Sequence, residues 1–196
     1  MSEKLIIVLL LVGGVLVWAV LAYNQLVALR NRFQNAFAQI DVQLKRRYEL
    51  IPNLVESAKA YMAHERGALQ EVIAARNSAD AARQSASARP ENVQAVRALS
   101  QAESAMGATL GRFMALAEDY PDLKANQTIG DLMEELASTE NRVGFARQAF
   151  NDAVMFYNTA CQSFPSNLIA KRYAFGPAEL LQIHNPEERK AVRVAF

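Results

Sequence analysis

The chain has 196 residues, 52% of them hydrophobic, and its 21 basic and 20 acidic side chains nearly cancel. This balance argues against the strong positive field of a nucleic-acid-binding surface, so we predict no nucleic-acid partner. Cys161 is the single cysteine of the sequence. It cannot form an internal disulfide, which fits a reducing compartment.

The first feature along the chain is an uncharged apolar run over residues 5–22. A helix of this length is about 27 Å long, close to the thickness of the hydrocarbon core of a bilayer. Gly13 and Gly14 are small residues of the kind that mark helix packing in membranes. Trp18 lies toward the end of the run, where aromatic rings prefer the headgroup level. We predict a tail and transmembrane anchor over residues 1–22, which contacts the lipid bilayer through residues 5–22.

A cleaved signal peptide is the main alternative for this run, because Val20, Leu21 and Ala22 form an acceptable cleavage site. The run is longer than the usual apolar region of about 7 to 15 residues, and the residues before it are weakly basic. A buried helix of a soluble protein is less favoured, since the run has no polar face.

Basic residues in the flanks predict the orientation of the anchor. Lys4 precedes the run and is offset by Glu3, whereas Arg30 and Arg32 follow it. The positive-inside rule then places the N-terminus outside and the C-terminal body in the cytoplasm. We therefore predict a single-pass protein of the inner (cell) membrane.

Apolar residues recur at spacings of three and four after the anchor and predict long amphipathic helices. The first continues from Tyr23 to Ile51, and Pro52 is expected to end it and to open a second helix. The sequence between residues 74 and 88 is rich in alanine, and we expect this end of the second helix to be exposed or frayed.

Prolines mark the remaining connections. A third helix is expected from about Pro90 to Tyr120, and a fourth from about residue 128 to 163, with Asn126 or Thr128 as its N-cap. No segment has the pattern of a strand. The fold class predicted is all-α: a single N-terminal transmembrane helix followed by an antiparallel up-down-up-down bundle of long helices over residues 23–174, with a C-terminal tail over residues 175–196 to which we assign no regular structure.

A polar turn in the first body helix is a candidate interaction surface. Its residues are Asp41, Lys45, Arg46 and Arg47. Asp41 and Lys45 are four apart, a spacing that favours an ion pair. We expect this turn at the end of the bundle far from the membrane, where it serves either as a solvated face or as a contact for another subunit. The apolar chain end at Phe196 is a second candidate contact.

Residues for chemistry are sparse. His64 and Glu65 resemble the start of a zinc motif, but no second histidine follows at the required position. We predict no catalytic residue, no metal site and no cofactor. Asn24, Asn151 and Asn158 each follow an aromatic residue. Because asparagine is unfavourable inside helices, we expect these side chains to form hydrogen bonds between helices.

Several sequence motifs resemble the LemA family. They include residues 23–27, 40–47, 50–55 and 118–125, together with Glu140-Asn141, Phe150-Asn151, Tyr157-Asn158 and Phe164-Pro165. The resemblance covers nearly the whole chain. It implies an antiparallel helical bundle behind one membrane helix, with no established enzymatic activity. Some members of that family are associated with membrane organisation, including magnetosome membrane formation.

The leading functional hypothesis is a non-enzymatic scaffold, anchored in the membrane, that forms homo-oligomers and recruits an unknown protein partner. The alternative is a monomeric adaptor or regulatory subunit of another membrane protein complex. An enzyme, for example a hydrolase, would need converging carboxylates, whereas the acidic residues here are spread along helical faces.

Overall fold

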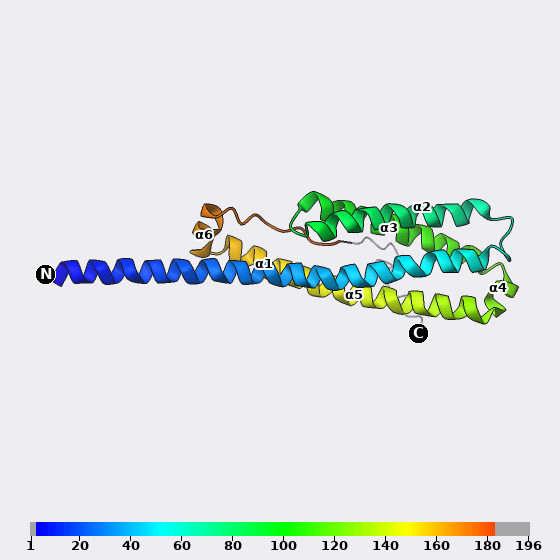
Figure 1. Ribbon diagram of the computed structural model, residues 1–196, viewed down its shortest axis with the longest axis horizontal. Coiled ribbons are helices and arrows are strands. Elements are labelled where there is room, and N and C mark those ends of the chain that lie inside the picture. The colour runs from blue at the N-terminus through cyan, green and yellow to red at the C-terminus, as the bar shows by residue number, and fades with distance from the viewer. Residues whose placement is uncertain (1–2, 183–196) are drawn as a thin grey trace, which may run out of the picture.

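The computed structural model describes residues 3–182, and all the regular secondary structure in this part of the chain is helical (Figure 1). The prediction of an all-helical protein with one long apolar N-terminal helix is confirmed. The helices are α1 (Glu3–Ala58), α2 (Arg66–Ala88), α3 (Val93–Ala117), α4 (Pro121–Ala125), α5 (Gln127–Gln162) and α6 (Ser166–Arg172).

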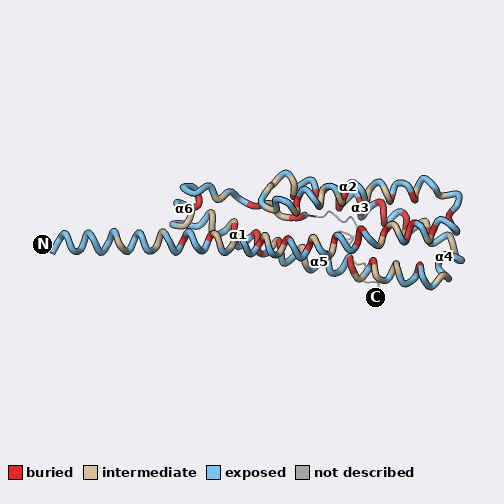
Figure 2. Tube along the Cα trace, in the orientation of Figure 1, coloured by how far each residue is buried: buried red, intermediate tan, exposed pale blue. Residues whose placement is uncertain are grey.

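The N-terminal part of α1 projects alone from the rest of the molecule (Figure 1). Its most apolar window has a mean hydropathy of 3.0 and is 6% buried, so this helix is long and apolar enough to span a membrane. Figure 2 shows the projecting part exposed on all sides, and the buried residues of α1 begin at Ala22 and Leu26. The apolar run over residues 5–22 and the first helix of the body are therefore one uninterrupted helix, α1.

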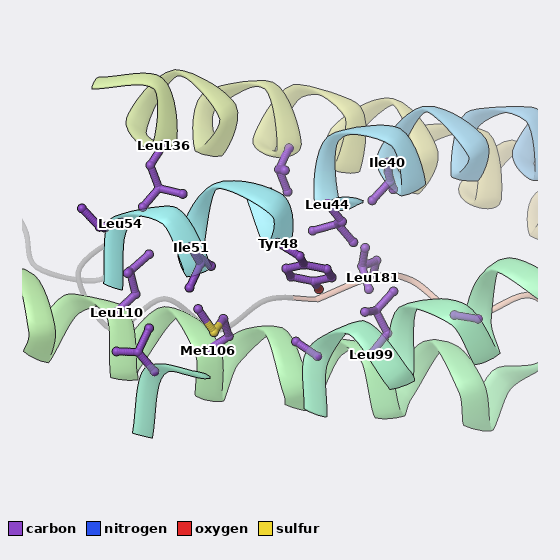
Figure 3. Packing of buried hydrophobic residues seen from close by; sticks show 14 of the residues in the cluster. Ile40, Leu44, Tyr48, Ile51, Leu54, Leu99, Met106, Leu110, Leu136 and Leu181 are labelled. Atoms are coloured by element: carbon purple, nitrogen blue, oxygen red, sulfur yellow. The ribbon is translucent and has the colours of Figure 1, made fainter. Parts of the chain in front are cut away.

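The body is built around the remaining length of α1, which packs against α5 and α2, while α2 packs against α3. The rings of Phe37 and Phe150 lie 5.5 Å apart and those of Phe33 and Tyr157 lie 5.0 Å apart. The later residue of α1, Phe37, thus faces the earlier residue of α5, Phe150. These two helices therefore run in opposite directions. Figure 3 shows the core between α1, α3 and α5, which includes Leu44, Ile51, Leu54, Leu99, Met106 and Leu136.

The prediction that Pro52 ends the first body helix is wrong, because α1 passes through Pro52 and ends at Ala58. Proline has no N–H to donate to the carbonyl four residues earlier, which here belongs to Tyr48. The Nε of Arg76, on α2, donates to that carbonyl at 3.0 Å. A side chain from a neighbouring helix thus supplies the hydrogen bond that the proline removes.

The second helix begins at Arg66 rather than at Pro52, and its alanine-rich half stays helical as far as Ala88, with some residues exposed and others buried. Val72, Ala79 and Ala86 recur every seven residues and are completely buried. The small side chains of Ala79 and Ala86 let α2 lie close to its neighbour α3. This half of α2 is therefore packed along one face.

The ends of the later helices follow the sequence signals more closely. Asn126 caps α5 by accepting from the Ile129 N–H at 3.2 Å, which confirms it as the N-cap. Its amide also donates to the Tyr61 hydroxyl at 3.0 Å. Asn92 caps α3 in the same way, and α3 ends at Ala117, a turn before the expected stop.

Replacing Arg76 by Met removes the donor to the Tyr48 carbonyl and is expected to lower the free energy of unfolding by about 1–3 kcal/mol. In a Pro52→Ala background the new N–H can bond the same carbonyl, so Arg76→Met should be less costly there. Urea unfolding of the four full-length variants in detergent measures this coupling, with Arg112→Met at an exposed position as the control. Equal losses in both backgrounds would contradict the assignment.

Candidate functional sites of the helical body

A buried ion pair lies at the centre of the body. Arg47 of α1 and Glu103 of α3 are 2% and 0% exposed, and their side chains meet at 2.8 Å. The Tyr48 hydroxyl donates to the other carboxylate oxygen of Glu103. Arg47 also reaches Glu140 of α5 at 3.1 Å. Together with the bond from Arg76 of α2 to the Tyr48 carbonyl, these contacts join all four long helices in one polar layer.

The electrostatics of this layer follow from its burial. Burial raises the pKa of the Glu103 carboxyl above its ordinary value, while the Arg47 charge and the Tyr48 hydroxyl act to lower it. Burial and then the Glu103 charge raise the pKa of the Tyr48 hydroxyl above the ordinary tyrosine range. Because Glu103 is inaccessible and bonded through both oxygens, we interpret the layer as a structural element rather than a catalytic one.

The residues of the predicted interaction surface all lie on α1, but their side chains contact different neighbouring helices. Asp41 forms an ion pair with Arg83 of α2 at 2.6 Å, instead of the expected pair with Lys45. Lys45 is exposed and lies 4.0 Å from Glu49. The pairing changes because α2 brings Arg83 alongside α1, which the linear spacing of residues in α1 cannot reveal.

The two arginines of this turn also face different neighbours. Arg46 pairs with Glu135 of α5, and Arg47 is enclosed in the polar layer. The turn does not lie at the end of the bundle, since α1 continues to Ala58. Arg47 is therefore not available as an exposed contact, whereas Lys45 and Arg46 remain on the surface.

Asn151 and Asn158 of α5 hold the chain that follows α6. Asn158 accepts from the N–H of Ala178 and donates to its carbonyl, both at 2.9 Å. Asn151 forms the same two bonds with Leu181, at 2.9 and 3.2 Å. Seven residues of helix and three residues of extended chain both span about 10 Å, so the two spacings match.

The prediction that these asparagines form hydrogen bonds between helices is wrong. The structure bonds Asn151 and Asn158 to an extended backbone, not to another helix, and Asn24 is exposed. The seven-residue repeat was visible in the sequence, but nothing local showed which segment would occupy it. We call the two side chains the asparagine clamp.

The clamped segment is part of the core, although it belongs to the C-terminal tail of the predicted domain division. Leu181 is completely buried, and Figure 3 places it between Tyr48 and Leu99. Glu179 forms an ion pair with Arg97 of α3 at 3.0 Å. The segment therefore ties α5 to α3. The predicted contact at Phe196 lies outside the described residues.

The anchor residues singled out in the sequence lie on the projecting part of α1. A methyl group added at Gly13 or Gly14 would meet no atom within 4 Å. Trp18 is half-buried. The prediction that these residues pack against a second helix therefore concerns a helix of another molecule and stays a prediction.

No group of three or more His, Cys, Asp or Glu side chains suited to a metal ion occurs within residues 3–182. His64 lies in the connection between α1 and α2, apart from any such group. A shallow groove of about 320 Å³ does occur where the anchor meets the body. It is lined mainly by apolar side chains of α1 and α5, among them Ala22, Leu26, Leu29, Phe156 and Ala160.

These features define a class of protein: a helical body continuous with one apolar helix that can associate with a membrane. The pattern of the LemA family matches residues 36–196, and the chain belongs to that family.

Comparison with characterised proteins gives partial matches to magnetosome proteins. "Magnetosome protein MamQ 2" of Paramagnetospirillum magneticum is 34% identical over 86 residues, which are 44% of this chain and 32% of that protein. "Magnetosome protein MamQ" of Magnetospirillum gryphiswaldense is 32% identical over 83 residues, 42% of this chain and 30% of that protein. The match thus spans about a third of the length of these relatives.

Replacing Tyr48 by Phe removes a buried hydrogen bond to a charged group and is expected to cost about 1.5–3 kcal/mol at pH 7. The raised pKa of Tyr48 means that the folded protein retains a proton that the unfolded chain loses above about pH 10. The stability contributed by Tyr48 is therefore present below that pH and is lost as pH rises further. Denaturant titrations from pH 9 to 11.5 should show a shallower decline in Tyr48→Phe than in the parent, and identical slopes would count against the assignment.

Replacing Asn158 by Leu keeps the number and branching of the side-chain heavy atoms but removes both bonds to Ala178. We expect the segment over residues 175–182 to be released more often and to be cleaved faster in limited proteolysis by a protease selective for Leu, read by mass spectrometry of the fragments. Asn24→Leu, at an exposed asparagine, is the matched control. Unchanged cleavage in Asn158→Leu would show that apolar packing of Leu181 alone retains the segment.

Proposed function

We propose that this protein is a non-enzymatic membrane-anchored scaffold that self-associates and organises or recruits proteins at the cytoplasmic face of the inner membrane. The observation that carries the proposal is the placement of exposed apolar side chains on α5. Phe145, Met155 and Phe156 of that helix are more than half exposed. Large apolar side chains exposed in this way are typical of protein contact surfaces.

The continuity of α1 supports this role. In the proposed arrangement, residues 1–22 anchor the protein, residues 23–174 form an antiparallel bundle and residues 175–196 form the tail. A helix that leaves the membrane without a hinge holds the α5 surface at a fixed height and orientation. Confinement to two dimensions raises the effective concentration of such surfaces, so contacts of modest area can build an assembly.

Retention and orientation of the anchor are also part of the proposal. Cleavage after Ala22 would cut a continuous helix at a residue that is 6% exposed, which favours retention over a signal peptide. Arg30 and Arg32 follow the apolar run and favour a cytoplasmic body. The similarity to magnetosome proteins supports a role in organising a membrane.

The mass of the full-length protein in a mild detergent tests the scaffold directly. We expect a defined homo-oligomer, and we expect a Phe145→Ser, Phe156→Ser double variant to have a lower mass while its helical circular dichroism and melting temperature change little. Val42→Ser removes an exposed apolar side chain from α1 instead and is the matched control. Light scattering after size-exclusion chromatography reports the mass.

A parent protein that is monomeric in detergent and forms no homotypic crosslinks in its native membrane would contradict self-association. If a different protein were then crosslinked in a fixed ratio, the alternative of a monomeric adaptor or regulatory subunit would replace the scaffold. Loss of assembly in the Val42→Ser variant alone would move the contact from α5 to α1.

A further inference from the structure

The short helix α6 lies beside the point where α1 leaves the apolar anchor (Figure 1). Tyr23 is the first residue after the run over residues 5–22. Its ring packs edge-on against Tyr173, with centroids 5.0 Å apart, and against Phe175 at 5.6 Å. These contacts hold the C-terminal end of α6 at the level of the last turn of the anchor.

The inner face of α6 is firmly attached to the body. Ala170 is 2% exposed, and the Ser166 hydroxyl donates to the carbonyl of Ala160 at 2.7 Å. The Phe175 N–H donates to the carbonyl of Ala170 at 2.9 Å. The orientation of α6 is therefore set by the fold, and its outward residues are presented at a fixed place.

The exposed residues of α6 and of the chain at its two ends include three large apolar side chains. Phe164 is 80% exposed, and Leu168 and Tyr173 are each 56% exposed. They lie at the start, the middle and the end of one short stretch. A single exposed apolar residue needs no explanation, but three within ten residues, next to an apolar anchor, form an apolar cluster that water solvates poorly.

The same stretch carries only positive charge. Lys171 and Arg172 are exposed in the last turn of α6, and the sequence from Ser163 to Ala174 contains no acidic residue. The Arg172 guanidinium lies 5.6 Å from the centre of the Tyr173 ring. Aromatic and aliphatic side chains beside lysine and arginine are the combination that enters the headgroup layer of an anionic membrane.

We propose that residues 164–173 form a second membrane contact, which inserts Phe164, Leu168 and Tyr173 into the headgroup layer of the leaflet from which α1 emerges and binds anionic phospholipid through Lys171 and Arg172. We call this stretch the α6 membrane contact. It rests on the proposed membrane-spanning role of residues 5–22. One spanning helix can rotate and tilt freely, whereas a second contact beside it fixes which side of the body faces the membrane.

Site-directed spin labels in the full-length protein test this contact. In a Cys161→Ser background, single cysteines replace Phe164, Phe145 and Leu11 in turn, and the labelled protein is placed in nanodiscs containing phosphatidylglycerol and phosphatidylcholine. Phe145 is a matched control because it is a phenylalanine of similar exposure, 74%, on α5, and nanodiscs that hold one protein each leave this part of the proposed α5 contact uncovered. Collision with oxygen reports contact with lipid, and collision with a water-soluble nickel chelate reports contact with water.

We expect the ratio of oxygen to nickel collisions to be severalfold higher at position 164 than at position 145, and highest at position 11. Replacing Lys171 and Arg172 by Glu should lower the ratio at position 164 in anionic nanodiscs, with a smaller change in nanodiscs of phosphatidylcholine alone. Equal ratios at positions 164 and 145 would overturn the proposal. Protection of position 164 from both reagents would do so too, since it would indicate a protein contact.

The label at position 11 separates the two proposals. A lipid-exposed label at position 11 with a water-exposed label at position 164 refutes the α6 membrane contact and leaves the anchor intact. A water-exposed label at position 11 refutes the anchor itself.

Discussion

The carboxyl group of Glu103 is the constraint on which the arrangement of the body depends. A buried carboxyl without partners is strongly destabilising, so the fold has to deliver hydrogen-bond donors to it. Arg47 and Tyr48 supply them, and they are neighbours on α1. A shift of one residue along α1 would rotate these donors away by about 100°. The buried pair thus fixes the register of α1 against α3, while apolar contacts alone would tolerate sliding.

The same turn of α1 also solves the difficulty created by Pro52. The Tyr48 carbonyl that the proline leaves unpaired receives Arg76 of α2, so α2 is fixed at the height where α3 and α5 meet α1. Because α1 does not break there, it extends from the projecting anchor to the far end of the body. Because α1 is continuous, the α5 surface and the α6 membrane contact that we propose both have fixed positions relative to the apolar run over residues 5–22.

The residues of α5 form two kinds of contact within the body and also leave aromatic side chains exposed. Phe150 and Tyr157 pack against α1, Asn151 and Asn158 hold the extended segment, and Phe145 and Phe156 remain exposed. The clamp closes the body on one side, since Leu181 fills space between α1 and α3. The exposed aromatics on α5 are the residues that we propose for contact with other chains.

The sequence by itself determined the elements whose causes are local or periodic. Charge-free length predicts the anchor, spacings of three and four predict the helices, and the capping preference of asparagine predicts the start of α5 at Asn126. Tertiary structure alone decided where long-range partners lie. Pro52 is tolerated inside α1 because Arg76 of α2 donates to the Tyr48 carbonyl that the proline leaves unpaired. Asp41 pairs with Arg83 rather than with Lys45 because α2 packs alongside α1. Arg47 can be buried because it forms an ion pair with Glu103 of α3. Asn151 and Asn158 bond to an extended segment rather than to a helix. Each of these outcomes depends on a residue 20 or more positions away, which no local pattern reveals.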